Sequence, residues 1–411
     1  MLAPLRDRTF RRLFLAQVVA LAGTGLLTVA LGLLAYDLAG PSAGVVLGTA
    51  LVIKIVAYVG VAPVVAACTE RVPRRVLLVS ADALRAGVAL LLPFAGQVWQ
   101  VYVLIAVLQA ASATFTPAFQ AIIPAVLPRP GEYTAALSLS RLAYDLEAVL
   151  SPLLAAAALT VLGYNALFVG TVFGFLGSAV LVAGTALPAL PVPERNTPLR
   201  TRIGAGAAVM VARPPLAGLL ALNAVVAAAT ALVLVNTVVY VRGPLGGGDT
   251  GVAVALGCFG AGSMLVALLL PALLRSRDRD RTVVLAGAAT VVGALAGSTV
   301  LLLTGVHWAT LAAAWTLLGA GTALIATPAA RLIRDTTAED ERAPVFTAQF
   351  SLSHACYLLT YPLAGWAGAL AGHAFAAAAL TLVATLATIT AVRLWPARRP
   401  AARAPAVTGK R

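Results

Sequence analysis

Four charged side chains stand inside long apolar stretches, where a charge is costly unless it is paired or functional. Lys54 lies in the middle of one stretch, and Arg141, Asp145 and Glu147 lie together in another. An ionised side chain at the centre of a bilayer costs about 2.5–3.5 kcal/mol on insertion scales. These four residues are therefore the candidates for proton coupling or substrate contact.

Lys54 and Glu147 reach a similar depth when each is counted from the end of its own stretch. Arg141 and Asp145 are four residues apart and share a helix face, whereas Glu147 points elsewhere. We hypothesise that Lys54 pairs with Glu147 or Asp145, and that the pair opens when a substrate or a proton arrives. The alternatives are a static ion pair that joins two helices, or wrongly placed helices.

The composition places these residues in a membrane protein. Of the 411 residues, 61% are hydrophobic and 11% are charged, whereas about 25% charged is usual for a soluble domain. A water-soluble fold cannot hide so much apolar surface, so lipid must be the solvent for much of it. The net charge of +14 does not indicate nucleic-acid binding, because the basic residues are spread over short loops.

The apolar stretches predict an all-α membrane protein of about twelve transmembrane helices, each needing about 20 residues. The first stretch is too long for the core of a cleavable signal peptide. The predicted spans are 13–38, 43–67, 76–95, 99–122, 136–160, 164–188, 214–241, 251–274, 282–304, 307–328, 343–371 and 373–395.

The basic residues indicate the orientation of these spans. Of 29 lysines and arginines, 25 lie at the chain ends or in loops on one side, and the opposite loops contain only Arg242. Cytoplasmic loops carry the excess of Lys and Arg. We therefore predict a multi-pass protein of the cell (inner) membrane with both termini in the cytoplasm.

The longest internal polar stretch divides the chain into six spans plus six. Thr116-Pro117-Ala118 recurs as Thr327-Pro328-Ala329, and Pro152 recurs as Pro362. These matches indicate two halves related by duplication, as in many transporters. We predict an N-terminal six-helix bundle at 1–188, a cytoplasmic linker at 189–213, a C-terminal six-helix bundle at 214–395 and a disordered basic tail at 396–411.

The loop after the second span resembles the motif G-x-x-x-D-R-x-G-R-R of the major facilitator superfamily. It reads Ala66-Ala67-Cys68-Thr69-Glu70-Arg71-Val72-Pro73-Arg74-Arg75, with the acid and three arginines kept and both glycines replaced. The segments 77–86, 115–124 and 238–242 resemble the macrolide- and enterobactin-exporter-like efflux branch. Two departures are Ser151-Pro152-Leu153-Leu154-Ala155-Ala156, in place of the antiporter element G-P-x-x-G-G, and a fourth span without arginine.

The resemblance implies a secondary transporter whose two six-helix pseudo-symmetric halves alternate access to a central path. We expect a monomeric antiporter, of the multidrug kind or for a siderophore or metabolite, that exports a small organic molecule in exchange for protons and needs no cofactor. The alternatives are an exporter of a metal ion or metal chelate, or an uptake permease of the same fold. A membrane-embedded enzyme is a further alternative, but no nucleophile–base pair or metal motif is visible within the spans.

The same resemblance assigns roles to two further groups of residues. Charge contacts of the loop after span two would hold the cytoplasmic side closed, unless its charges only set topology; the candidates are Glu70, Arg71, Arg74, Arg75, Asp82 and Arg85. Spans one, four, seven and ten would line the central path. Their candidate residues are Gln17, Thr24, Gln109, Asn223, Asn236 and Trp315, for each of which an interhelical hydrogen bond is the alternative.

The histidines and cysteines predict no metal site or disulfide, because they are dispersed. His354 stands near Tyr357 and Tyr361 within the eleventh span. We expect it to be a hydrogen-bonded core residue, with a role in proton handling as the alternative.

The predicted topology puts the two chain ends in one compartment. Single cysteines placed at Ala3 and Lys410, in a background without the three native cysteines, should both react with a membrane-impermeant maleimide only after the membrane is opened. Labelling of one end but not the other in sealed cells would contradict an even number of crossings.

Overall fold

The computed structural model describes residues 3–58, 72–127, 130–188, 199–273 and 280–396. The regular structure within these ranges is helical. No β-strand occurs in these ranges. Within them, some side chains of residues 116–149 and of a few other helix ends are not described, among them those of Arg141 and Asp145. The all-α prediction is therefore confirmed.

The first half supplies six long helices that match the first six predicted spans. The second of them is described only to Tyr58, because residues 59–71, which end the predicted span at 43–67, lie outside the described residues. The six helices are α1 Arg8–Ala39, α2 Ala43–Val56, α4 Arg74–Leu91, α5 Val98–Val126, α6 Pro130–Leu159 and α7 Asn165–Ala183.

The second half supplies the other six spans. Its eleventh span is divided at Cys356 into two helices that continue one another, and the stretch expected to be a linker contains a helix of its own, α8 Leu199–Ala212. The spans are α9 Pro214–Arg242, α10 Asp249–Leu273, α11 Asp280–Thr304, α12 Trp308–Thr336, α13 Glu339–Ala355 with α14 Tyr357–Ala371, and α15 His373–Leu394. The predicted tail lies outside the described residues beyond Pro396.

Nine helical segments in the described ranges are long and apolar enough to cross a membrane. The first segment runs from Arg8 to Val56 and holds two of the predicted spans, because α1 and α2 follow one another almost without a break. The helix α6 contributes only a short apolar piece, Leu150–Leu159. The division of the eleventh span leaves α13 and α14 below 18 residues each.

Glycine ends two of the helices where the backbone must turn sharply. Gly40 after α1 has φ 52° and Gly372 between α14 and α15 has φ 93°. A residue with a Cβ is strained in this region of backbone space, whereas glycine is not. The very short turn predicted at residues 372–373 is therefore made by one glycine.

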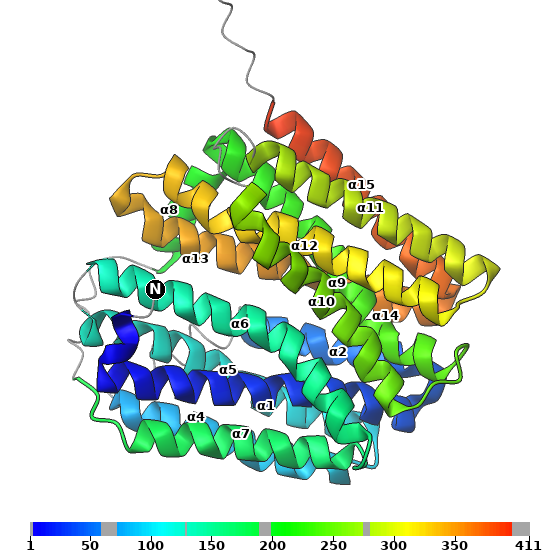
Figure 1. Ribbon diagram of the computed structural model, residues 1–411, viewed down its shortest axis with the longest axis horizontal. Helices are drawn as coiled ribbons and strands as arrows, with labels where there is room; N and C mark the ends of the chain where they lie inside the picture. The colour runs from blue at the N-terminus through cyan, green and yellow to red at the C-terminus, as the bar shows by residue number, and fades with distance from the viewer. Residues whose placement is uncertain (1–2, 59–71, 128–129, 189–198, 274–279, 397–411) are drawn as a thin grey trace, which may run out of the picture.

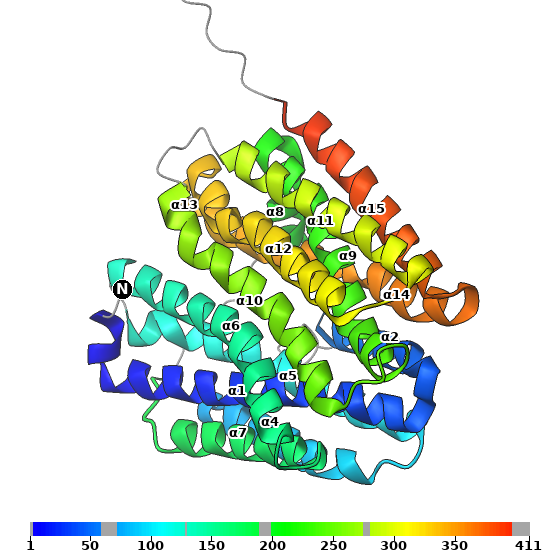
Figure 2. The ribbon, with the colours of Figure 1, turned by 45° about the vertical axis from the view of Figure 1, so that its right-hand side comes forward.

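The helices form two bundles, one from α1 to α7 and one from α9 to α15 (Figure 1). In the first bundle α1 packs on α6 and α7, and α4 packs on α5 and α7. In the second α12 packs on α10 and α11, and α9 packs on α15. The two bundles meet chiefly where α6 packs on α10 and α2 packs on α14 (Figure 2).

Arginines close helix ends at the side of each bundle that carries the basic loops, which we name the basic end. Arg12 donates to the carbonyl of Gly184 at 2.6 Å, and Arg75 donates to that of Ala183, so both cap the end of α7. Arg281 donates to the carbonyl of Trp395 at 2.6 Å, at the end of α15. Cations are favourable at the negative end of a helix dipole, so these residues have a structural reason to be basic.

A further arginine ties three helices of the second bundle together at the basic end. Arg213 donates to the carbonyl of Thr336 and pairs with Glu341 at 2.7 Å. The backbone N–H of Ala338 and the Arg213 guanidinium hold the pKa of the Glu341 carboxyl below its usual value. This contact fixes the start of α9 to the end of α12 and the start of α13.

Glycines bring α2 and α14 into backbone contact at the opposite side, which we name the far end. A Cβ on Gly365 would overlap the carbonyl oxygen of Gly44, and one on Gly48 would lie 2.9 Å from the carbonyl oxygen of Tyr361. Beside them Trp366 donates to the hydroxyl of Thr49 at 3.0 Å. Small residues at a helix crossing allow this approach.

The substitution Gly365→Ala should open this crossing, because overpacking of a close contact costs about 1–3 kcal/mol. A disulfide between Thr49→Cys and Trp366→Cys, formed with copper phenanthroline in a background without native cysteines, should then form more slowly. The matched control is Gly87→Ala, where an added Cβ meets nothing within 4 Å. Equal cross-linking in both variants would show that the glycine contact does not hold the far end together.

Candidate functional site

Lys54 of α2 and Glu147 of α6 lie within electrostatic range of one another. Each side chain is the charged group that acts on the other, and both are half-buried. They come from two helices of the same bundle, and their direct pairing stays a prediction. Asp145, the other partner considered, lies outside the described side chains, as does Arg141.

Gly25 of α1 positions Glu147. A Cβ on Gly25 would overlap the side chain of Ser151 and would lie 2.8 Å from Oε1 of Glu147. Because glycine has no side chain, α6 lies directly against α1 and presents its carboxylate beside that helix. A small residue of the first span thus determines where a charge of the fifth span stands.

His354 of α13 adds a third titratable group, which comes from the other bundle. Its ring lies within electrostatic range of Lys54 and stacks on that of Tyr58 with centroids 6.3 Å apart. Its Nδ1 is 2.7 Å from the carbonyl oxygen of Phe350. Lys54, Glu147 and His354, which we call the charged cluster, therefore stand where the two bundles meet.

The sequence did not connect His354 with Lys54. Three hundred positions separate the two residues, and only the packing of two different bundles brings them together. The available signal was that Lys54 and His354 each lie well inside an apolar stretch.

The structure describes four of the six residues predicted for gating. Glu70 and Arg71 lie outside the described residues. Arg74 begins α4, and the neighbouring Arg75 caps α7 as described above. The gating role of this loop stays a prediction.

Asp82 and Arg85 form an ion pair inside the first bundle. Their residues are 0% and 5% exposed, and the guanidinium lies over the rings of Phe115 at 4.3 Å and Phe175 at 4.5 Å. The pair thus sits between α4, α5 and α7, and its aromatic neighbours belong to the same bundle. This geometry holds three helices together.

Two of the predicted path residues make equivalent contacts in the two halves. Gln17 of α1 accepts a hydrogen bond from Ser140 of α6 at 3.0 Å. Asn223 of α9 exchanges hydrogen bonds with Gln349 of α13, the shorter at 2.9 Å. The first span is thus joined to the fifth as the seventh is to the eleventh, which extends the internal repeat to polar contacts.

Three other predicted path residues also bond to helices. Thr24 donates to the carbonyl of Ala20, one turn back in its own helix. Asn236 donates to the carbonyl of Ala364 at 3.2 Å, and Trp315, 1% exposed, donates to Thr237 at 2.7 Å. The bonds of Asn236 and Trp315 agree with the alternative of interhelical packing, whereas that of Thr24 lies within its own helix. Gln109 of α5 is half-buried.

An ionic contact that the sequence analysis did not predict joins the two bundles at the far end. Arg242 at the end of α9 lies 3.5 Å from Asp37 of α1 and 2.6 Å from Asp249 of α10. Its guanidinium also lies 5.6 Å from the ring centroid of Tyr36. We name Asp37, Arg242 and Asp249 the far-end clasp. The signal in the sequence was that Arg242 is the one basic residue in the loops opposite the arginine-rich ones.

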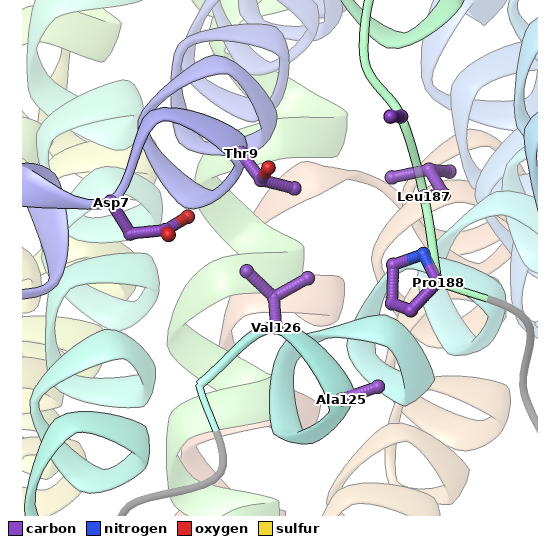
Figure 3. A pocket seen from close by; sticks show the side chains of 7 residues that line it. Asp7, Thr9, Ala125, Val126, Leu187 and Pro188 are labelled. Carbon is purple, nitrogen blue, oxygen red and sulfur yellow. The ribbon is translucent and has the colours of Figure 1, made fainter.

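A hollow of about 380 Å³ lies between the start of α1, the end of α5 and the segment after α7 (Figure 3). None of its lining residues belongs to the charged cluster. Asp7 and Thr9 at the start of α1 are its polar lining, and the rest is apolar. Asp7 already accepts from the backbone N–H of Phe10 at 2.7 Å as the cap of α1. We therefore place the site at the charged cluster, where ionisable groups from both bundles converge.

In the described part of the chain, no three His, Cys, Asp or Glu side chains gather. The charged cluster has one carboxylate and one imidazole. Its groups can exchange protons and hydrogen-bond a ligand.

The sequence and the fold were compared with known protein families and solved structures. A family model described as Major Facilitator Superfamily matches residues 13–306. No curated protein matches the sequence. The chain is similar to the solved structure of the nucleoside transporter NupG, at 12% identity and a TM-score of 0.70, covering 94% of this chain and 100% of that one.

Two further solved structures are similar to this chain. One is a POT family transporter in complex with 5-aminolevulinic acid, at 10% identity and a TM-score of 0.72, covering 95% and 96% of the two chains. The other is a bacterial homolog of the human lysosomal transporter Spinster in an inward-facing conformation, at 12% and 0.70, covering 96% and 98%. At such identities the likeness shows the fold alone.

The clasp generates a prediction about the far end. Replacing Arg242 by Ala should let the bundles separate there more often, by a few-fold, because a partly exposed ion pair contributes about 0.2–1 kcal/mol. Spin labels at Leu162→Cys and Thr304→Cys, one in each bundle, should report a larger population of long distances. The control is Arg281→Ala, which removes an arginine whose contact lies within one bundle. An unchanged distance distribution in Arg242→Ala would show that the clasp does not hold the bundles together.

Proposed function

Because the chain belongs to the Major Facilitator Superfamily, we propose that it is a secondary transporter that exports a small organic molecule in exchange for protons. The family model covers well over half of the chain. Transport by this fold proceeds by rocking of the two bundles around a site near the middle of the membrane. The charged cluster is the candidate for that site.

The electrostatic proximity of Lys54 and Glu147 is the observation that supports the proposal. Both charges stand inside segments that cross the membrane, where an unpaired charge is expensive. As a pair they neutralise one another. Any event that removes one charge leaves the other without its partner, and the local structure must respond.

A single carboxylate offers a direct way to couple two fluxes. When Glu147 takes up a proton it loses its charge. The neutral carboxyl group accepts a hydrogen bond from a donor group of a substrate less strongly than the carboxylate does. Proton and substrate therefore compete for one group, and competition for one site makes their binding antagonistic. Antagonistic binding is what exchange in opposite directions requires.

The two ends of the molecule supply the remaining parts of the cycle. We infer that the basic end faces the cytoplasm, as the distribution of arginine predicts, so that the far-end clasp closes the outside. The charges of the loop after span two, from Glu70 to Arg75, would hold the opposite side closed in the other half of the cycle. Exposed ion pairs suit this purpose because they are weak enough to break and reform.

The substrate is not indicated by the similar structures. Nucleosides and 5-aminolevulinic acid belong to those proteins, whose identity to this chain is 12% and 10%. The proposal is export of an organic molecule by a monomer in the cell inner membrane. An uptake permease of the same fold would differ in the direction of movement.

Transport assays in proteoliposomes test the proposal. The assay uses a mixture of ethidium, a macrolide and a catechol siderophore, and mass spectrometry measures how much of each compound crosses the membrane. At least one compound should move in the direction opposite to the proton flow. Glu147→Gln should reduce this gradient-dependent transport by about tenfold or more, because an amide does not exchange a proton. Lys54→Ala should do so as well, because it leaves Glu147 without its partner.

The control is Glu132→Gln, the same substitution near the start of α6. It should leave the gradient dependence unchanged. Full gradient-dependent transport by both Glu147→Gln and Lys54→Ala, at normal expression, would remove the pair from the mechanism. Movement in the same direction as the protons would replace export by uptake.

A further inference from the structure

Aromatic rings form a continuous face along the eleventh span. Phe350, His354, Tyr357 and Tyr361 recur every three or four residues, which places them on one side of α13 and α14. Their ring centroids lie 4.2, 6.1 and 4.9 Å apart in chain order. We call these four residues the ring face.

Tyr58 brings a ring from the other bundle to this face. Its plane is within 13° of that of His354, with centroids 6.3 Å apart. Tyr58 stands one helical turn from Lys54 on the same side of the second span. The contact of the two rings therefore lies beside the charged cluster, at the junction of the bundles.

Most of these rings are more exposed than the aromatic residues in the core of a bundle. Trp315 and Tyr240, which pack edge to face inside the second bundle, are each 1% exposed. Phe350 is 46% exposed, and Tyr58, His354 and Tyr357 are half-buried. Three members of the ring face thus keep accessible surface although they already lie against one another, whereas Tyr361 is 5% exposed.

The position of the ring contact matters because it joins parts that must move. Tyr58 belongs to the first bundle and His354 to the second, and near the far end the same two spans cross at Gly44 and Gly365. When the bundles rock, the rings separate and each loses a stacking partner. A flat ligand can take the place of the lost partner on both.

We propose that Tyr58 and His354 hold a planar aromatic ring of the transported molecule between them. This inference rests on the proposed function, because it names the class of molecule that the charged cluster and the ring face accept together. Stacking supplies the contact with the ring. Polar substituents of the ring meet a donor in Lys54 and an acceptor in Glu147.

The probe for this proposal is acridone, a flat, neutral and fluorescent compound with one carbonyl and one N–H group. Its binding to the full-length protein in nanodiscs is measured by fluorescence anisotropy, with empty nanodiscs subtracted. The matched competitor is 2-aminobenzophenone, which has two aromatic rings, a carbonyl and N–H donors but is not planar. Acridone should bind, and 2-aminobenzophenone should displace it only at concentrations at least about tenfold above the Kd of acridone.

Variants separate stacking from folding. Tyr58→Leu and His354→Leu should each weaken acridone binding by about tenfold, the loss expected when an aromatic stacking partner is removed. Tyr58→Phe and His354→Phe keep a ring and should retain binding. Phe173→Leu, a ring 69% exposed on α7, should have no effect.

Three results would overturn the inference. They are no binding of acridone to the unaltered protein, equal affinity in the Leu variants, or equal competition by the twisted compound. None of them bears on Glu147, whose role is decided by gradient-dependent transport. Conversely, the inference is supported if acridone binding is lost in the Leu variants and kept in the Phe variants. That result holds even if transport proves to be independent of protons.

Discussion

Hydrocarbon cannot solvate a polar group, and this constraint explains most of what the structure contains. Backbone groups inside a bilayer must be paired, which is why the described chain is helical. Among the described charged side chains inside the bundles, Asp82 pairs with Arg85, and Lys54 lies within electrostatic range of Glu147. The two pairs differ in their surroundings, since the first is enclosed by aromatic rings in one bundle and the second stands beside the other bundle. Only the second can be altered by movement between the bundles.

Close packing of helices depends on glycine in this protein, because lipid gives helices no hydrophobic reason to associate. In the first bundle Gly23 and Gly174 bring α1 against α7, and in the second Gly262 and Gly319 bring α10 against α12. Among the described residues, the same device between the bundles, at Gly44 and Gly365, is accompanied by few polar contacts. We therefore regard each bundle as the rigid unit and their junction as the part that changes.

Two of the contacts that join the bundles are of the kind that can be exchanged. The far-end clasp is a partly exposed ion pair, and the stacking of Tyr58 on His354 is a contact of two half-buried rings. Neither is comparable to the buried core of a bundle. A carrier needs this difference, since contacts worth many kcal/mol would fix one arrangement.

Hydropathy was enough to predict the helical class and the approximate positions of the spans, because the bilayer acts on each segment separately, whereas the orientation taken from the arginines and the domain boundaries stay predictions. Local sequence also identified Lys54 and Glu147, since a charge in an apolar run needs a reason wherever it occurs. The helix at 199–212 and the interruption at Cys356 were missed, because hydropathy does not register a helix outside the spans or a local break within one.

Only the tertiary structure decided which partners these residues meet. It placed His354 and Tyr58 beside the charged pair and joined Arg242 to Asp37, and it turned Asn236 and Trp315 into helix–helix contacts. Each of these choices depends on the rotation and crossing of helices that lie far apart in the chain. Those angles are set by side-chain packing over many residues at once, and no single segment contains them.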